Sequence, residues 1–421
     1  MKLAIKLGIL SAANLGFAFL LQWYIVIEFG PGVNTDALFA GATIPQFVLA
    51  IISGSLMHVL VPMFSGESEE QLRRDAWGFL ILIGGLFGLI TIILELTASW
   101  WVPLTVPGFD VAGQVLTIEL ARIQLIGLVF AAINGVQWAT YHSRQQFLWA
   151  ESTPIFGSAI ALLLLVWALP RYGVIAAAWI SVLRFAFQAL LLAPGMGLPV
   201  SLNLKSHTLR EGWKRVKPLL LGTAYYKTDP VVDRVLLSMA GSGSLTLYYV
   251  AQQIYGAVGQ VANKAIAVPL VPELSRLYKA GDRRGFQKAY STRLLMVGIV
   301  GFVAVLMLGL FGQGLLTFVV GHRNVSSGNV KDLWWIMMWL SGMFVGGVVG
   351  QVTSSSFYAM GDTSTPTRIG IYTYTLYVPA KLALFFYFGI VGLAVATSVF
   401  VVLNVILQTR ILKTKHFDVS H

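Results

Sequence analysis

Long apolar segments recur along this chain and constrain its fold more than any other feature. A helix needs about 20 apolar residues to cross a bilayer, and 57% of the 421 residues are hydrophobic while only 11% are charged. This pattern excludes the soluble globular classes and predicts an all-α polytopic membrane protein. It predicts about twelve transmembrane helices, at residues 7–29, 36–62, 76–99, 114–141, 153–170, 174–195, 216–239, 246–275, 291–317, 330–358, 368–388 and 390–410.

Basic residues lie in every second loop between these segments. One set of loops, together with the two ends of the chain, contains Lys2, Lys6, Arg73, Arg74, Arg144, Lys205, Arg210, Lys214, Arg215, Arg276, Lys279, Arg283, Arg284, Lys288, Arg410, Lys413 and Lys415. The other set contains only Arg171 and Arg323. Cytoplasmic loops carry an excess of Lys and Arg, so both termini are expected in the cytoplasm. The net charge of +11 then reflects the excess of Lys and Arg in the cytoplasmic loops, and no nucleic-acid partner is expected.

Three short motifs occur twice, in the same order and about 210 to 216 residues apart. They are Val61-Pro62-Met63-Phe64-Ser65 with Val271-Pro272-Glu273-Leu274-Ser275, Ser152-Thr153-Pro154 with Ser364-Thr365-Pro366, and Tyr172-Gly173-Val174-Ile175 with Phe388-Gly389-Ile390-Val391. Six predicted helices separate each copy from its partner, which predicts two six-helix lobes related by a parallel pseudo-two-fold repeat. The expected division is a lobe at 1–196, a basic cytoplasmic linker at 197–215, a lobe at 216–410 and a cytoplasmic tail at 411–421.

The predicted seventh helix concentrates charge within an apolar environment. Lys227, Asp229, Asp233 and Arg234 fall within eight residues, and charges inside a membrane usually mark a substrate or ion path. Pro230 lacks an N–H and is expected to bend or loosen the helix. These residues indicate one wall of a polar cavity. The alternative is that the four charges pair with each other or reach the interface.

The chain also resembles a known family through an ordered set of motifs. They are Glu28-Phe29-Gly30-Pro31-Gly32-Val33-Asn34-Thr35-Asp36, Ile44-Pro45-Gln46, Val61-Pro62, Pro107-Gly108-Phe109, Asp233-Arg234, Gly243-Ser244-Leu245, Tyr248-Tyr249-Val250-Ala251, Val271-Pro272-Glu273-Leu274-Ser275, Gly361-Asp362 and Thr365-Pro366. This set is similar to the MurJ/MviN family of lipid II flippases, in the multidrug/oligosaccharidyl-lipid/polysaccharide exporter superfamily. The resemblance implies a multi-pass protein of the bacterial cytoplasmic membrane. Many members of the family have fourteen helices, whereas twelve are expected here.

The family's substrate-binding residues match this sequence only in part. Arginines of the first, second and eighth helices, which are thought to meet the substrate diphosphate, correspond to Leu15 and Leu21, Leu49, and Gln253. The aspartate at the mouth of the cavity corresponds to Asp36. The resemblance therefore implies that the fold is kept while the anion site is altered.

Other cations are candidates to compensate the two charges of a lipid-linked diphosphate. They are Lys227, Arg234 and Lys264, which we expect to meet in one water-accessible cavity between the lobes. Gln253, Gln260 and Lys264 share one face of the eighth helix, and the glutamines fit either substrate contact or hydrogen bonding between helices. With Asp36, these residues form the predicted substrate-binding set.

Several features bear on mechanism. Lys381 is isolated in the eleventh helix and fits either the cavity or a tight structural partner. The glycine-rich segment 342–350 favours close packing of helices, not a phosphate loop. Cysteine is absent, and neither a metal-ligand cluster nor a nucleophile with a base is visible in the sequence.

The family resemblance implies a flippase that carries a polyprenyl diphosphate saccharide, such as a lipid II-like cell-wall precursor, and the repeat fits alternating access between two lobes. The alternatives are a flippase for an exopolysaccharide or O-antigen precursor and, less favoured, a drug/cation antiporter. The protein is expected not to be an enzyme, to be a monomer and to need no cofactor. Coupling to Na⁺, H⁺ or the membrane potential is expected to use Asp229 or Asp233.

Overall fold

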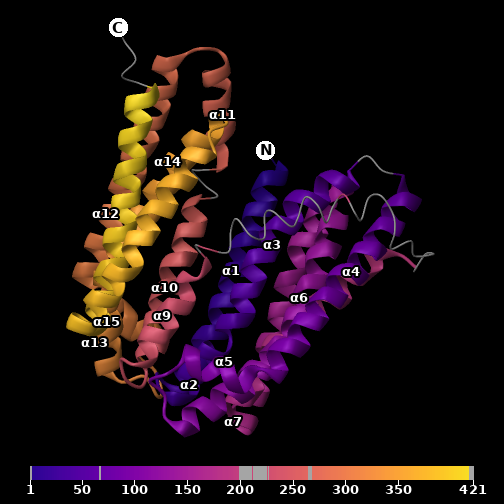
Figure 1. Ribbon diagram of the computed structural model, residues 1–421, viewed down its shortest axis with the longest axis vertical. Helices are drawn as coiled ribbons and strands as arrows, with labels where there is room; N and C mark the ends of the chain where they lie inside the picture. The colour runs from indigo at the N-terminus through magenta and orange to yellow at the C-terminus, as the bar shows by residue number, and fades with distance from the viewer. Residues whose placement is uncertain are drawn as a thin grey trace. The chain divides into compact units, whose positions relative to one another are not determined.

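The computed structural model describes residues 2–65, 68–198, 211, 225, 227–263 and 268–416. These residues are almost entirely α-helical, and no strand occurs among them. Their contacts form two compact units, Met1–Thr246 and Leu247–His421 (Figure 1).

The first unit is built around one long central helix, α6. This helix packs against α2, α3, α4, α5 and α7, and about half of its residues are buried. The side chains of Phe64, Phe79, Phe87 and Val136 form a core between α3, α4 and α6. The helices of this unit are α1 (Lys2–Phe29), α2 (Val33–Gly41), α3 (Thr43–Phe64), α4 (Glu69–Leu96), α5 (Ala98–Thr105), α6 (Val111–Ser143), α7 (Phe147–Leu192), the 3-10 turn η1 (Ala193–Met196) and α9 (Asp229–Ser238).

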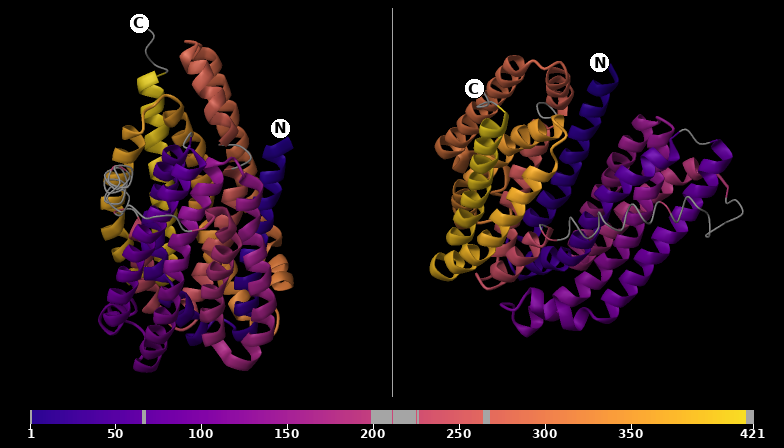
Figure 2. Two further views of the ribbon diagram at one scale, coloured as in Figure 1. Left: turned by 90° about the vertical axis from the view of Figure 1, so that its right-hand side faces the viewer. Right: turned by 45° about the horizontal axis from the view of Figure 1, so that its top comes forward.

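In the second unit α14 has the central place, because it packs against α11, α12, α13 and α15. The yellow helix α15 lies beside the orange α14 in all three views (Figures 1 and 2). The helices are α10 (Ser244–Ala262), which begins in the first unit, α11 (Val268–Lys279), α12 (Arg283–Val319), α13 (Ser327–Trp339), α14 (Ser341–Ala359) and α15 (Ser364–His416).

Short polar side chains set the starts of several long helices. Ser68, Asp110, Asp282 and Ser326 each accept a hydrogen bond from the backbone N–H three residues later. Such N-caps satisfy donors that have no partner within the helix. The apolar segments therefore begin at defined residues.

Two glycines break the longest helical stretches at corresponding places of the repeat. Gly173 in α7 has φ +67° and ψ −157°, and Gly389 in α15 has φ +59° and ψ −138°. These backbone angles are open almost only to glycine. Each of the two stretches is thus a pair of helices, with the breaks between 170 and 174 and between 388 and 390 that the sequence predicts.

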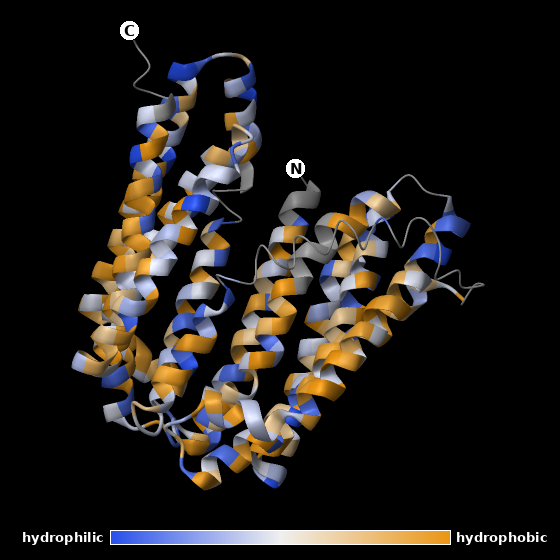
Figure 3. Cartoon of the chain, viewed as in Figure 1, coloured by the Kyte–Doolittle hydropathy of each residue, from blue (hydrophilic) through white to orange (hydrophobic). Residues whose placement is uncertain are grey.

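The described helices have the dimensions of a membrane protein. Six are long and apolar enough to cross a bilayer, or seven if α13 and α14 count as one bent span. Two of the six, Phe147–Met196 and Ser364–Thr414, have 50 and 51 residues and contain the glycine breaks. Figure 3 shows apolar residues along the long helices and hydrophilic residues concentrated near their ends. The predicted all-α polytopic fold is confirmed, and the described helices, with the two glycine breaks and the shorter segments counted, are consistent with about twelve spans.

Two spans predicted as single helices are bent or broken. The span predicted at 36–62 divides into α2 and α3 at Ala42. The span at 330–358 bends by 43° between α13 and α14. There the Ser398 hydroxyl donates to the Trp339 carbonyl at 2.6 Å and accepts from the Met343 N–H at 3.2 Å. A side chain inserted into the helical hydrogen-bond ladder is a known cause of bending.

The compact units do not begin and end where the predicted lobes do. Contacts with α3 and α5 group α9 with the first unit, while the repeat assigns residues 216–410 to the second lobe. Compact units defined by contacts need not coincide with lobes defined by a sequence repeat. The predicted lobe boundaries at residues 196 and 216 therefore stay a prediction. Most of the predicted linker at 197–215 lies outside the described residues.

Candidate functional site

Asp36, in the first turn of α2, is buried and binds the beginning of α10. Its side chain is 1% exposed. Its carboxylate accepts hydrogen bonds from the Gly243 N–H at 2.6 Å, the Thr246 N–H at 2.8 Å and the Thr246 hydroxyl at 2.5 Å. The donors lie at the N-terminus of a helix, where N–H groups lack internal acceptors and negative charge is favourable. We call Asp36, Gly243 and Thr246 the Asp36 clamp.

Glycine turns bring the clamp residues together. Gly30 has φ +71° and Gly243 has φ +86°, values that suit glycine. A Cβ on Gly243 would lie 3.2 Å from Pro31, so the two turns pack closely. The Thr35 hydroxyl donates to the Gly30 carbonyl at 2.9 Å and fixes the approach to α2. Both turns belong to motifs on which the family resemblance rests.

The clamp joins corresponding positions of the two halves. Asp36 and Thr246 are 210 residues apart, which is also the separation of Val61 and Val271 in the repeat. The clamp therefore links two segments that the predicted repeat assigns to different lobes.

The charges predicted for the seventh helix occupy different environments. Asp233 and Arg234 are buried, at 1% and 5% exposed, whereas Asp229 is half-buried and Lys227 is exposed. The Arg234 guanidinium attracts the Asp36 carboxylate electrostatically. Pro230 lies in the first turn of α9, where its missing N–H leaves no helical bond unmade. Lys227 is helical and Thr228 forms a turn just before α9, so the helix is interrupted beside Pro230. The bend expected within the span stays a prediction, because most of residues 212–226 lie outside the described part of the chain.

A neighbouring loop packs on the other end of α9. The Gly108 N–H donates to the Ser238 hydroxyl at 3.2 Å, and a Cβ on Gly108 would lie 2.3 Å from the Ser238 carbonyl oxygen. Only glycine allows this approach. The contact gives a structural reason for the Pro107-Gly108-Phe109 motif.

The other predicted substrate residues are not brought to one described site. Lys264 lies outside the described residues, so its meeting with Lys227 and Arg234 stays a prediction. On α10, Gln253 is half-buried and Gln260 is exposed. Both carboxylate oxygens of Asp36 already accept hydrogen bonds, which favours a role in holding segments together over direct contact with an anion.

Lys381 on α15 is fully buried against aromatic rings. Its side chain is 0% exposed, and its Nζ lies 4.8 Å from the centroid of the Tyr377 ring. Tyr377 stacks on Phe400 with ring centroids 4.3 Å apart, and its hydroxyl lies 2.9 Å from the Thr397 hydroxyl. This cation–π contact fits the tight structural environment that the sequence left as one of two possibilities.

A cavity in the second unit was not predicted from the sequence. It has a volume of about 490 Å³ and is lined by α14, by the second half of α15 and by Asn263 at the end of α10. Ser354, Asn404 and Gln408 line it and are hydrogen-bonded to each other. We call it the α14–α15 cavity. Its only sequence signal was the spacing of Asn404 and Gln408, four residues apart in an apolar helix.

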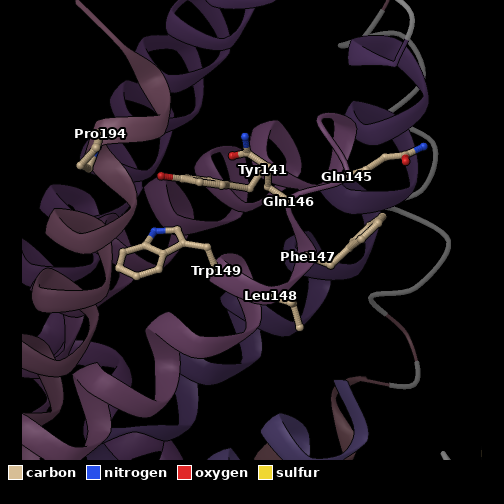
Figure 4. A pocket seen from close by; sticks show the side chains of 7 residues that line it. All are labelled: Tyr141, Gln145, Gln146, Phe147, Leu148, Trp149 and Pro194. Carbon is tan, nitrogen blue, oxygen red and sulfur yellow. The ribbon is translucent and has the colours of Figure 1, made fainter. Parts of the chain in front are cut away.

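A second cavity of about 490 Å³ lies where α6 meets α7 (Figure 4). Tyr141, Phe147, Trp149 and Pro194 line it with two glutamines. Beside it, Arg144 forms an ion pair with Glu69. This end of the unit is firmly tied, because the Trp149 indole also donates to the Leu191 carbonyl at 3.2 Å.

Comparison with known proteins gives a consistent result. A family model described as lipid II flippase MurJ matches residues 25–419. A protein of Vibrio cholerae serotype O1 named "Probable lipid II flippase MurJ" is 23% identical over 414 residues, covering 90% of this chain and 77% of that protein. The "Lipid II flippase MurJ" of Burkholderia cenocepacia is 20% identical over 366 residues, covering 82% and 71%.

Solved structures show the same fold. A lipid II flippase MurJ in an inward closed conformation superimposes with a TM-score of 0.83 at 16% identity, over 96% of this chain and 87% of that chain. An inward-facing multidrug resistance MATE family transporter of the MOP superfamily superimposes with a TM-score of 0.80 at 16% identity, over 98% and 96%.

Proposed function

The chain belongs to the MurJ family of lipid II flippases, and from this premise we propose that it moves a lipid-linked saccharide across the membrane. The observation that carries the proposal is the family match across residues 25–419. The substrate class is a polyprenyl diphosphate saccharide of the lipid II type. Such a molecule is moved without a change in its covalent bonds, so we propose that the protein is a transporter and not an enzyme.

Alternating access requires contacts that break and re-form in each cycle. The Asp36 clamp suits this role, because its three hydrogen bonds join segments that the predicted repeat assigns to different lobes. Burial from water strengthens such bonds while they are made. We propose that the clamp is closed in one state and opens in the other.

In this proposal, the charged residues of the predicted seventh and eighth helices have two roles: some bind the substrate, and others couple its transport to an ion or to the membrane potential. Lys227, Arg234 and Lys264 compensate the diphosphate. Asp229 or Asp233 couples transport to Na⁺, H⁺ or the membrane potential. Moving an anion outward is assisted by an inside-negative potential, by about 2.3 kcal/mol per charge per 100 mV.

Two other substrates remain as alternatives within the fold. An exopolysaccharide or O-antigen precursor carries the same polyprenyl diphosphate, and it fits the absence of the family arginines at Leu15, Leu21, Leu49 and Gln253. A drug/cation antiporter is supported only by the likeness to the MATE fold. The family model favours the lipid substrate over the cation.

Purified protein in liposomes tests the proposal. Fluorescent lipid II is expected to reach the opposite leaflet faster with protein than in empty liposomes. A polyprenyl diphosphate-linked exopolysaccharide unit and an organic cation, assayed in the same liposomes, separate the alternatives. Transport of the cation alone would contradict the proposal.

Two variants test the coupling residues. Asp229→Asn and Asp233→Asn are expected to reach the membrane in normal amounts and to lose flipping. Full flipping by wild type and both variants, without sodium and with the potential collapsed, would refute the coupling. Equal loss of folded protein would instead indicate that the aspartates serve as structural ion-pair partners.

We propose that the protein is a monomer with both termini in the cytoplasm. Because the chain has no cysteine, Lys413→Cys and Arg171→Cys each give a single thiol for labelling. The first is expected to react with reagent on the cytoplasmic side and the second from outside. Native mass spectrometry in detergent checks the monomer.

A further inference from the structure

Polar side chains line the α14–α15 cavity, and no charged one is among the lining residues that the structure describes. Asparagine, glutamine, serine, tyrosine and glycine line it, together with Phe400 and two valines. Polar side chains on membrane helices are costly unless they are bonded or face a polar space. The described lining therefore suits a neutral ligand with many hydrogen-bonding groups, and it supplies no cation to compensate a diphosphate.

A ladder of hydrogen bonds fixes the orientation of the lining side chains. The Ser354 hydroxyl donates to Gln408 Oε1 at 3.0 Å, and Gln408 Nε2 donates to Asn404 Oδ1 at 2.6 Å. Asn404 Nδ2 then donates to the Thr373 hydroxyl at 2.9 Å. Hydrogen bonding between helices and between residues four apart on one helix is sufficient to explain these three contacts.

Two further observations are not explained by helix packing. Gln351 lines the cavity, and its Oε1 is buried without a hydrogen-bond partner among the described residues. An unpaired buried acceptor is costly, and a donor from a ligand would satisfy it. A Cβ on Gly347 would meet nothing within 4 Å, whereas one on Gly346 or Gly350 would touch a valine of α15 at 3.0 or 2.9 Å. The cavity is therefore open beside Gly347.

Aromatic rings complete the lining. Phe400 is held in place by stacking on Tyr377, and Tyr358 is half exposed at 51%. Sugars offer both hydroxyl groups, which pair with amides and hydroxyls, and apolar faces, which pack against rings. Few polar groups at defined positions on an otherwise apolar wall are typical of small-molecule sites.

We infer that the α14–α15 cavity binds the saccharide part of the lipid-linked substrate, as a subsite whose described lining is polar and uncharged. Gln351 and the ladder of Ser354, Asn404 and Gln408 bind sugar hydroxyl or acetamido groups. Gly347 leaves the space that the sugar ring enters. This inference rests on the proposed function.

Binding of two lipids by the full-length protein tests the subsite. The probes are polyprenyl diphosphate carrying the disaccharide–pentapeptide and polyprenyl diphosphate alone, titrated by native mass spectrometry. Gly347→Leu fills the open side and is expected to weaken binding of the sugar-bearing lipid at least tenfold. Gln351→Leu removes one acceptor and is expected to weaken it about fivefold. Neither variant is expected to change binding of the sugar-free lipid.

Gly298→Leu is the matched control. Gly298 is a helical glycine of α12 in the same unit, and a Cβ there also meets nothing within 4 Å. This variant is expected to bind both lipids as wild type does. Equal weakening of both lipids by Gly347→Leu, or no weakening, overturns the subsite.

A single thiol gives a second readout that does not depend on the lipid assay. Gly347→Cys is expected to react with a water-soluble maleimide, and the sugar-bearing lipid is expected to slow labelling at least fivefold while the sugar-free lipid does not. Gly298→Cys is the control, and the sugar-bearing lipid is expected to slow its labelling no more than the sugar-free lipid does. An unreactive Gly347→Cys overturns the subsite alone. Wild-type protein that binds neither lipid overturns the proposed function and the subsite with it.

Discussion

The helix pairs α6–α7 and α14–α15 stand at corresponding places of the predicted repeat, yet their asparagine and glutamine side chains bond to different kinds of partner. In the first pair, Asn134 Nδ2 donates to the Phe185 carbonyl at 3.0 Å and Gln137 Nε2 to the Ala189 carbonyl at 3.1 Å. These amides bond from side chain to backbone, across the contact between the helices.

In the second pair, glycines make the close contact between helices and the amides bond to other side chains. Gly346 and Gly350 approach Val401 and Val405, which confirms the expected role of the glycine-rich segment in helix packing. A backbone carbonyl is fixed by its helix, but a side chain can rotate to a new partner. The difference suggests that the first pair is built for rigidity and the second for exchanging partners with a ligand.

The Asp36 clamp is the strongest case of bonding between side chain and backbone in the first unit. Asp36→Ala leaves two buried N–H groups without acceptors and is expected to lower the free energy of unfolding by about 3 kcal/mol. The expected result is a lower midpoint of heat unfolding in detergent and loss of flipping. Asp36→Asn keeps one acceptor oxygen and should lose about half as much. An unchanged midpoint for Asp36→Ala would show that the clamp contributes nothing to stability.

Substitutions at the two glycine breaks test whether the breaks contribute equally to stability in the two halves. Gly173→Ala and Gly389→Ala place a Cβ in open space, so the expected cost of about 2 kcal/mol each comes from the backbone angles alone. Thermal unfolding in detergent measures it. Gly85→Ala, in a regular and open part of α4, is the control and should not destabilise. A loss at only one of the two breaks would contradict their equivalence.

Double-mutant cycles test the difference in polar bonding directly. Asn404→Leu and Gln408→Leu remove two bonded members of the ladder, and their effects on stability are expected to be coupled by about 1 kcal/mol. Asn134→Leu and Gln137→Leu remove donors to separate carbonyls, and their effects are expected to be coupled less strongly than those of Asn404→Leu and Gln408→Leu. Equal coupling in both cycles would remove the distinction between the two helix pairs.

The smallest expected effect is the difference in stability between an alanine at Gly347, which has open space beside it, and one at Gly350, which packs against α15. Gly347→Ala gains helix propensity without a clash and is expected to stabilise by about 0.5 kcal/mol. Gly350→Ala must displace the Val405 side chain, 2.9 Å from the new Cβ, and is expected to destabilise by about 0.5 kcal/mol. Unfolding midpoints of the two variants, compared side by side, check the sign of each change.

The sequence by itself determined the membrane class, the helix pattern and the repeat. These follow from local chemistry, because apolar length sets a span and glycine permits backbone angles that other residues avoid. The breaks at Gly173 and Gly389 were therefore predictable from two short motifs. The family resemblance, confirmed by the match over residues 25–419, rested on the same local signals.

Only the tertiary structure decided which polar groups meet. The partners of Asp36 are 207 and 210 residues away, and the Ser398 hydroxyl that bends α13 against α14 acts from 55 and 59 residues away. The family resemblance placed Asp36 with the substrate residues, and nothing in the sequence near Asp36 indicates N–H donors that distant. Spacing along one helix shows which side chains share a face, but the group opposite that face depends on how other helices pack against it.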